Sequence, residues 1–144
     1  MKTRYSSLVS IKKDAMQKSE LVVQEQNHLL QKAQKAYEEA LKSFGDIEFP
    51  SNGKVSDFLA ARGLMEAQQA IVEKNSAWVA YAKSQLQQAQ ETLKKAMIEY
   101  EKFNYLELEE MKKIEQQRKI QEAKELDEVA LLTHAQKLSE KTFS

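Results

Sequence analysis

The stretch GDIEFPSNGKVS, residues 45–56, decides the fold, because turn-forming residues gather there in a chain with few helix breakers. Gly45 is a typical residue at the end of a helix. Pro50 and the Asn-Gly pair after it are turn formers. Ser56 followed by Asp57 predicts a second helix start, because serine caps free backbone N–H groups and an acid suits the positive end of the helix dipole. The stretch therefore separates two helical segments.

Upstream of this turn, apolar residues recur every seven positions, which predicts a helix over about residues 4–44. The main track is Val9, Met16, Val23, Leu30, Tyr37 and Phe44. A neighbouring track is also apolar, and it comprises Leu8, Ala15, Val22, Leu29 and Ala36. We therefore expect both tracks to form one wide buried stripe.

Downstream of the turn, two heptad tracks run without a break and predict a helix over about residues 56–138. The first is Phe58, Met65, Val72, Val79, Leu86, Leu93 and Tyr100. The second is Ala61, Gln68, Asn75, Ala82, Ala89, Ala96 and Phe103. A strict seven-residue period implies a left-handed supercoil, and the polar layers at Gln68 and Asn75 are expected to fix its register.

Because the loop at residues 45–55 is short, the helices should fold back on each other. We therefore predict an all-α protein, residues 1–144 forming a single coiled-coil domain, in which two long helices make an antiparallel coiled-coil hairpin. Placing Phe44 against Phe58 gives apolar layers throughout, namely Tyr37 with Met65, Leu30 with Val72, Val23 with Val79, Met16 with Leu86 and Val9 with Leu93.

The same pairing leaves the residues after about Glu101 without a partner, so the C-terminal helix should overhang the hairpin. The stretch ELEEMKKIEQQRKIQEAKELDE, residues 107–128, is very polar and has no Gly or Pro. Its Glu and Lys residues three or four apart favour an exposed single helix. A sparse apolar face is expected near its end, formed by Leu126, Val129, Ala130 and Leu138.

Composition and motifs argue against most chemical functions. Lys+Arg and Asp+Glu both number 22, so no overall charge attracts nucleic acid, and no apolar run approaches a membrane span, which leaves at most a peripheral membrane association. There is no cysteine, nucleotide-binding loop or metal-ligand cluster, and the two histidines are isolated on different helices. We expect no enzyme activity, no catalytic residue, no cofactor and no metal, so the function should lie in binding other proteins.

Two stretches resemble the FliJ family of flagellar type III export proteins: RYSSLVSIKKDAMQK at residues 4–18 and EQQRKIQEAKELDEVALLTHAQK at residues 115–137, the latter with the ELDE ending typical of that family. The resemblance covers essentially the whole chain. It implies a cytoplasmic central stalk at the inner-membrane export apparatus, which binds the export ATPase hexamer, reaches the export gate protein FlhA and escorts export chaperones.

The resemblance also implies candidate binding residues. On the gate side these are Tyr37, Leu41, Phe58 and Met65, although Tyr37 and Met65 also belong to the predicted seam. The terminal end alone has an unpaired helix long enough to thread a ring, which places the ATPase contact there. The candidate residues on that side are Lys12, Lys13, Leu126, Asp127 and Glu128.

Three other functions share this pattern: the equivalent stalk of a virulence type III secretion system, a prefoldin-like holdase and a generic coiled-coil scaffold. Prefoldin subunits carry strand-forming inserts at the turn, and IEFPSNGKV is too short for a full set. An enzyme is the least favoured class.

Overall fold

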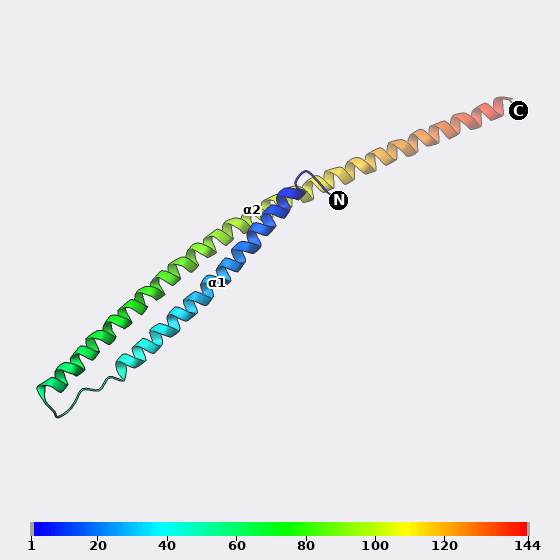
Figure 1. Cartoon of the computed structure of the whole chain (residues 1–144). Coiled ribbons are helices and arrows are strands. Elements are labelled where there is room, and N and C mark those ends of the chain that lie inside the picture. The colour runs from blue at the N-terminus through cyan, green and yellow to red at the C-terminus, as the bar shows by residue number, and fades with distance from the viewer. Residues whose placement is uncertain (1, 144) are drawn as a thin grey trace. The chain divides into compact units, whose positions relative to one another are not determined.

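The computed structural model describes residues 2–143 as two α-helices joined by a loop (Figure 1). Helix α1 spans Ser6–Gly45 and α2 spans Val55–Phe143. No strand occurs in this described range, and the two helices pack against each other. The predicted all-α helical hairpin is therefore confirmed.

The chain divides into two compact units. The hairpin unit is Lys13–Ile98, and the terminal unit combines Met1–Lys12 with Glu99–Ser144. Within the hairpin unit, α1 and α2 lie side by side and run in opposite directions (Figure 1). That residues 1–144 form one domain stays a prediction.

The start of α2 is capped two residues earlier than the sequence suggested. The backbone N–H of Lys54 donates a hydrogen bond to Asp57 Oδ2 at 3.2 Å, so Lys54 is the N-cap and Asp57, at the third helical position, closes a capping-box contact. Ser56 lies inside the helix and is not the cap. Gly53 precedes this cap with a φ of 155°, and a Cβ there would lie 2.8 Å from Asp57 Oδ2. The cap therefore requires glycine.

The first turn of α1 is capped reciprocally, in the terminal unit. Thr3 Oγ1 accepts a hydrogen bond from the N–H of Tyr5 at 3.1 Å, and Ser6 Oγ accepts one from the N–H of Thr3 at 2.8 Å. The Ser6 hydroxyl also donates to Glu107 Oε1 at 2.9 Å. One side chain thus closes the cap of α1 and links it to α2.

The seam of the hairpin unit uses one predicted track of α1 and replaces the other. The track from Met16 to Phe44 is partly buried, as are both predicted tracks of α2 from Ala61 onward. Most of the neighbouring track of α1 lies outside the seam, because Val22 and Leu29 are 44% and 36% exposed, and only Ala36 of that track is partly buried. Its place is taken by Ser19, Gln26, Ala33 and Ala40. The predicted wide stripe is therefore wrong for one of its two tracks.

The register between the helices also differs from the predicted one. Gln68 Nε2 donates a hydrogen bond to the carbonyl oxygen of Ala40 at 3.3 Å, where the prediction placed Arg62. A shallow groove is lined by both Val22 and Ala89, where the prediction placed Ala80.

The observed register pairs large side chains with small ones. From the groove at Val22 and Ala89, continued by the heptad spacing, we infer that Val23 lies opposite Ala89 and Leu30 opposite Ala82. The same spacing puts Val79 with Ala33 and Val72 with Ala40 in neighbouring layers, and the Gln68 amide reaches the Ala40 carbonyl from one turn away. The four alanines are 0–8% exposed and are the buried core of the described chain. Alternating volumes fill the interface more completely than two large side chains facing each other, because an overpacked layer forces the helices apart.

Candidate protein-binding surfaces

The four gate-side candidates all lie in the hairpin unit, but the structure does not bring them into one cluster. Leu41 is 43% exposed and lines a shallow groove with Phe44, Gln69 and Val72. Phe58 is 40% exposed in the first turn of α2. Since Gln69 is the neighbour of Phe44, Phe58 lies about 16 Å further along α2 at 1.5 Å per residue. The expected Phe44–Phe58 contact is therefore wrong.

The other two gate-side candidates, Tyr37 and Met65, are partly buried on the seam tracks of α1 and α2. Their apolar surface is already used in holding the helices together. Leu41 and Phe58 are thus the members of the set that offer the most surface to a partner.

The ATPase-side candidates fall into separate places. Lys12 belongs to the terminal unit, where its ammonium lies 3.6 Å from Glu99 Oε2 and 5.6 Å from the centre of the Phe103 ring. Lys13 is exposed and belongs to the hairpin unit. Leu126 is 70% exposed, and it lies about 40 Å along α2 from Glu99. Lys12 is therefore committed to contacts within the chain, whereas Leu126 is available.

Other charged contacts join the start of α1 to α2 in the terminal unit. Arg4 Nη2 lies 3.5 Å from Glu110 Oε2, and the Arg4 guanidinium lies 5.0 Å from the centre of the Tyr5 ring. Together with the Ser6–Glu107 bond, this pair places acids of α2 along the first turns of α1. Sequence patterns did not single out Glu99, Glu107 or Glu110. Glu107 and Glu110 continue the two heptad tracks of α2, which would have been the signal for them, whereas Glu99 lies beside the tracks.

The last part of α2 is fully exposed. Every described side chain from Gln116 to Thr142 is exposed. The large apolar side chains among them are 53–71% exposed, and they are Ile120, Leu126, Val129, Leu131, Leu132 and Leu138. At about 100° per residue, Leu138 lies about 120° around the helix from Leu126, so these residues wrap around α2 and do not form one stripe.

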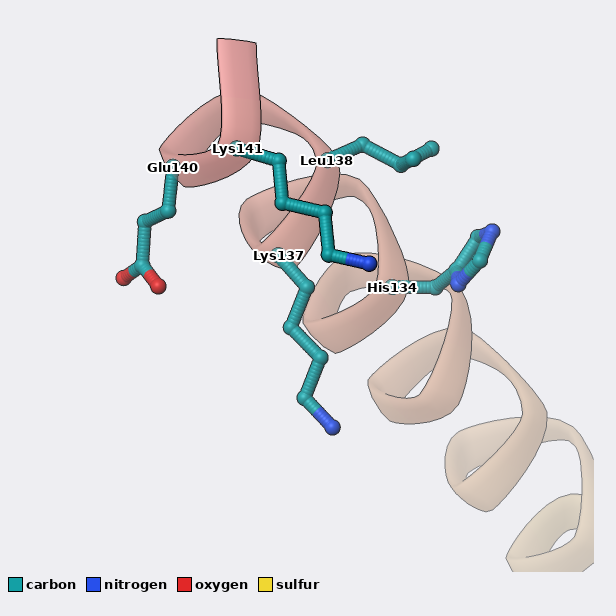
Figure 2. A pocket seen from close by; sticks show the side chains of 5 residues that line it. All are labelled: His134, Lys137, Leu138, Glu140 and Lys141. Atoms are coloured by element: carbon teal, nitrogen blue, oxygen red, sulfur yellow. The ribbon is translucent and has the colours of Figure 1, made fainter. Parts of the chain in front are cut away.

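Shallow hollows on this segment lie between side chains one turn apart on a single helix. Leu126 and Val129 line one with Glu122 and Glu125. Figure 2 shows another, where His134 and Leu138 extend from the same helix and Glu140 points away from them. A hollow with one helix as its only wall cannot enclose a small molecule. A protein partner is the ligand that such a surface fits.

Ion pairs within α2 support this segment as an isolated helix. Arg118 Nη2 lies 2.6 Å from Glu115 Oε1, and Arg118 Nη1 lies 2.7 Å from Glu122 Oε1. The hydrogen bond from Arg118 lowers the pKa of the Glu115 carboxyl, and the same bond raises the pKa of Arg118. Pairs three and four residues apart stabilise a helix that has no neighbour to pack against.

Clusters of three or more His, Cys, Asp or Glu residues that could hold a metal ion are absent from residues 2–143. In the same range, neither helix combines the length and the apolar character needed to cross a bilayer.

The fold and its exposed faces define an α-helical hairpin protein whose surfaces suit other proteins. The model of the family described as "Flagellar FliJ protein" matches residues 1–139. Because this match covers nearly all of the 144 residues, the chain belongs to the FliJ family, whose members are components of the flagellar export apparatus. Comparison with curated proteins found no match, and neither did comparison with solved structures.

Proposed function

We propose that this protein is the central stalk of the flagellar type III export ATPase and performs no chemistry itself. The observation that carries the proposal is the exposed helix from Gln116 to Thr142, in a chain that belongs to the FliJ family. A long unpartnered helix is the element that can enter the pore of a hexameric ring. Its exposed apolar side chains on several faces suit a surrounding ring better than a single flat partner.

The ATPase contact is assigned to the terminal unit, at Leu126, Asp127 and Glu128. Leu126 has the exposed apolar surface that gives affinity, and the two neighbouring acids favour a basic lining in the pore. The proposal keeps Lys12 and Lys13 as weaker charged contacts near the start of α1, where Lys12 also pairs with Glu99 and Lys13 belongs to the hairpin unit. Exposed charges of this kind contribute little individually and are screened by salt.

The gate contact is assigned to the hairpin unit, at Leu41 and Phe58, with Tyr37 and Met65 as neighbours. In this proposal the partner is the export gate protein FlhA, and the stalk works in the cytoplasm at the inner-membrane export apparatus. The exposed apolar surface of Leu41 and Phe58 supports the assignment. The same proposal includes the escort of export chaperones, and its support is the chain's membership of the FliJ family.

The test is stimulation of the export ATPase by the full chain and by a truncation lacking residues 120–144. The truncation removes most of the exposed part of α2 and leaves the hairpin unit intact. We expect loss of ATPase stimulation with unchanged thermal unfolding of the hairpin. As a control, Leu41→Ala with Phe58→Ala should weaken FlhA binding and leave stimulation unchanged. Full stimulation by the truncated chain would contradict the proposed orientation.

A further inference from the structure

The two flanks of the hairpin seam differ sharply in chemistry. On one flank, which we call the apolar flank, the side chains beside the seam include Val22, Leu29, Ala36, Leu64, Ile71 and Trp78, with Gln85 and Thr92 as polar members of the α2 row. On the other, the corresponding positions are Glu20, Asn27, Gln34, Gln69, Ser76 and Lys83. Both helices therefore place apolar residues on the same flank, and all of these residues belong to the hairpin unit.

The groove beside Val22 shows that the two halves of the apolar flank adjoin. It is lined by Val22 from α1 and by Thr92 from α2, among others. Thr92 continues the heptad track of Leu64, Ile71 and Trp78, so the α1 and α2 halves lie on one side of the seam. The large members are 36–58% exposed. Gln85 interrupts this track on α2 between Trp78 and Thr92. A largely apolar strip along a two-helix seam is typical of a face that packs against further helices.

A row of charges borders this strip on α1. Lys18, Glu25, Lys32 and Glu39 are spaced by seven, so they lie on one line beside Val22 and Leu29, and their signs alternate along it. In the described part of the chain, no salt bridge is formed by any of the four.

This row of charges is complementary to the same row of a second copy when the two α1 helices run antiparallel. A two-fold axis near Leu29 brings Glu25 opposite Lys32 of the second copy and Lys18 opposite its Glu39. By symmetry all four charges of each copy then face an opposite charge. A parallel, in-register pair would instead place like charges together. The same axis places Leu29 against Leu29 and Val22 against Ala36 of the second copy, so the apolar and charged rows agree on one arrangement.

We propose that the apolar flank is a self-association surface, through which two copies of this chain pair antiparallel to form a four-helix bundle. The inference goes beyond the proposed stalk function and does not depend on it. In the paired state α1 of one copy lies along the groove between α1 and α2 of the other. Trp78, beside Ala36 across the seam, is then covered by the second copy near Val22.

The experiment is sedimentation equilibrium of the full chain up to about 100 μM, with tryptophan emission recorded on the same samples. One chain has a mass of 16.6 kDa. We expect the average mass measured in solution to rise from this value to twice this value as the concentration increases. Trp78 is the only tryptophan, so its emission should shift to shorter wavelength in parallel. A constant monomer mass would overturn the proposal, as would a doubling in which the emission does not shift.

Two sets of variants locate the interface. Leu29→Glu places two like charges at the axis and should raise the dimer Kd at least tenfold, whereas Gln34→Glu, on the polar flank of the same helix, should leave it unchanged. Lys32→Glu should weaken the dimer by creating repulsion with Glu25 of the second copy. Adding Glu25→Lys to Lys32→Glu restores complementary charges and should restore the dimer. Equal weakening by Gln34→Glu, or no rescue by the double reversal, would overturn the proposal.

Discussion

The side-chain amide of Gln68 donates a hydrogen bond to the backbone carbonyl of Ala40 across the hairpin seam, at 3.3 Å. This contact joins a polar seam layer of α2 to a small residue of α1, and only one register of the two helices allows it. The small residue matters, because a larger side chain at Ala40 would stand between the amide and the backbone. Polar layers of this kind fix register more than they add stability.

Loss of this contact should cost a modest amount of stability. Gln68→Ala is expected to reduce the free energy of unfolding by about 1 kcal/mol, the usual net value of one hydrogen bond. Gln69→Ala is the matched control, because Gln69 is the exposed neighbour on the same helix. Urea unfolding of both variants is the measurement. If Gln68→Ala and Gln69→Ala lower the free energy of unfolding equally, the Gln68–Ala40 hydrogen bond does not stabilise the seam.

The observed register predicts a rescue between two seam positions. Ala82→Leu should cost about 1–3 kcal/mol, because Ala82 is 3% exposed and faces Leu30. Leu30→Ala alone should cost about 2 kcal/mol through the space it leaves. Combining the two exchanges large for small within one layer and should recover most of the stability in thermal melts.

Ala80→Leu, at an exposed position of α2, is the control for the volume change and should be nearly neutral. The alternative register, with Leu30 facing Val72, predicts no coupling between positions 30 and 82. Additive losses in the double variant would therefore rule out the arrangement described here.

Two glycines of the same chain should respond in opposite directions to alanine. Gly53→Ala is expected to cost about 1 kcal/mol or more, because its φ is 155° and the new Cβ would meet Asp57 Oδ2. Gly63→Ala should raise the free energy of unfolding by about 0.5–1 kcal/mol, since Gly63 lies within α2 and no atom lies within 4 Å of the new Cβ. Chemical denaturation checks both. A stabilising Gly53→Ala would show that the cap of α2 is not as described.

The Arg118–Glu115 pair makes the exposed part of α2 sensitive to acid. Because the pKa of Glu115 is lowered in the folded chain, the pair's contribution to helix stability is fully present above the ordinary pKa of glutamate, about 4.3, and is lost as pH falls through the lowered value. Arg118→Ala should return the Glu115 pKa toward its ordinary value and speed amide exchange around it. Arg62→Ala, which removes the distant Arg62–Glu66 pair, should leave both unchanged. NMR titration and hydrogen exchange are the measurements.

The sequence predicted the helical hairpin because its strongest signals are local. The turn residues between Gly45 and Ser56 and the heptad spacing of each helix are such local signals. Both helices begin within two residues of the expected positions, and α2 continues past the expected end at residue 138 to Phe143. Register depends on how two surfaces fit, and heptad spacing alone does not tell whether the Ala40 carbonyl lies within reach of Gln68 or beside Arg62. The size alternation of Val79 with Ala33, and of Leu30 with Ala82, was the unused signal.

The candidate binding residues were harder to predict for a related reason. Exposure distinguishes Leu41, 43% exposed, from the seam residue Tyr37, and only packing reveals it. Likewise, Lys12 reads as a free charge in the sequence until Glu99 is placed beside it. The exposed state of Leu126 was predictable, because the stretch around it is too polar to bury.

The four buried alanines have a consequence for how this protein responds to temperature. No large side chain in the described chain is fully buried, so unfolding exposes little apolar surface for its length. The heat-capacity change of unfolding follows that exposed surface, and we expect it to fall below the usual 12–15 cal/mol/K per residue, a rough average for globular proteins. A small heat-capacity change flattens the curve of stability against temperature. The hairpin should therefore keep a nearly constant stability from cold to warm conditions, which differential scanning calorimetry measures directly.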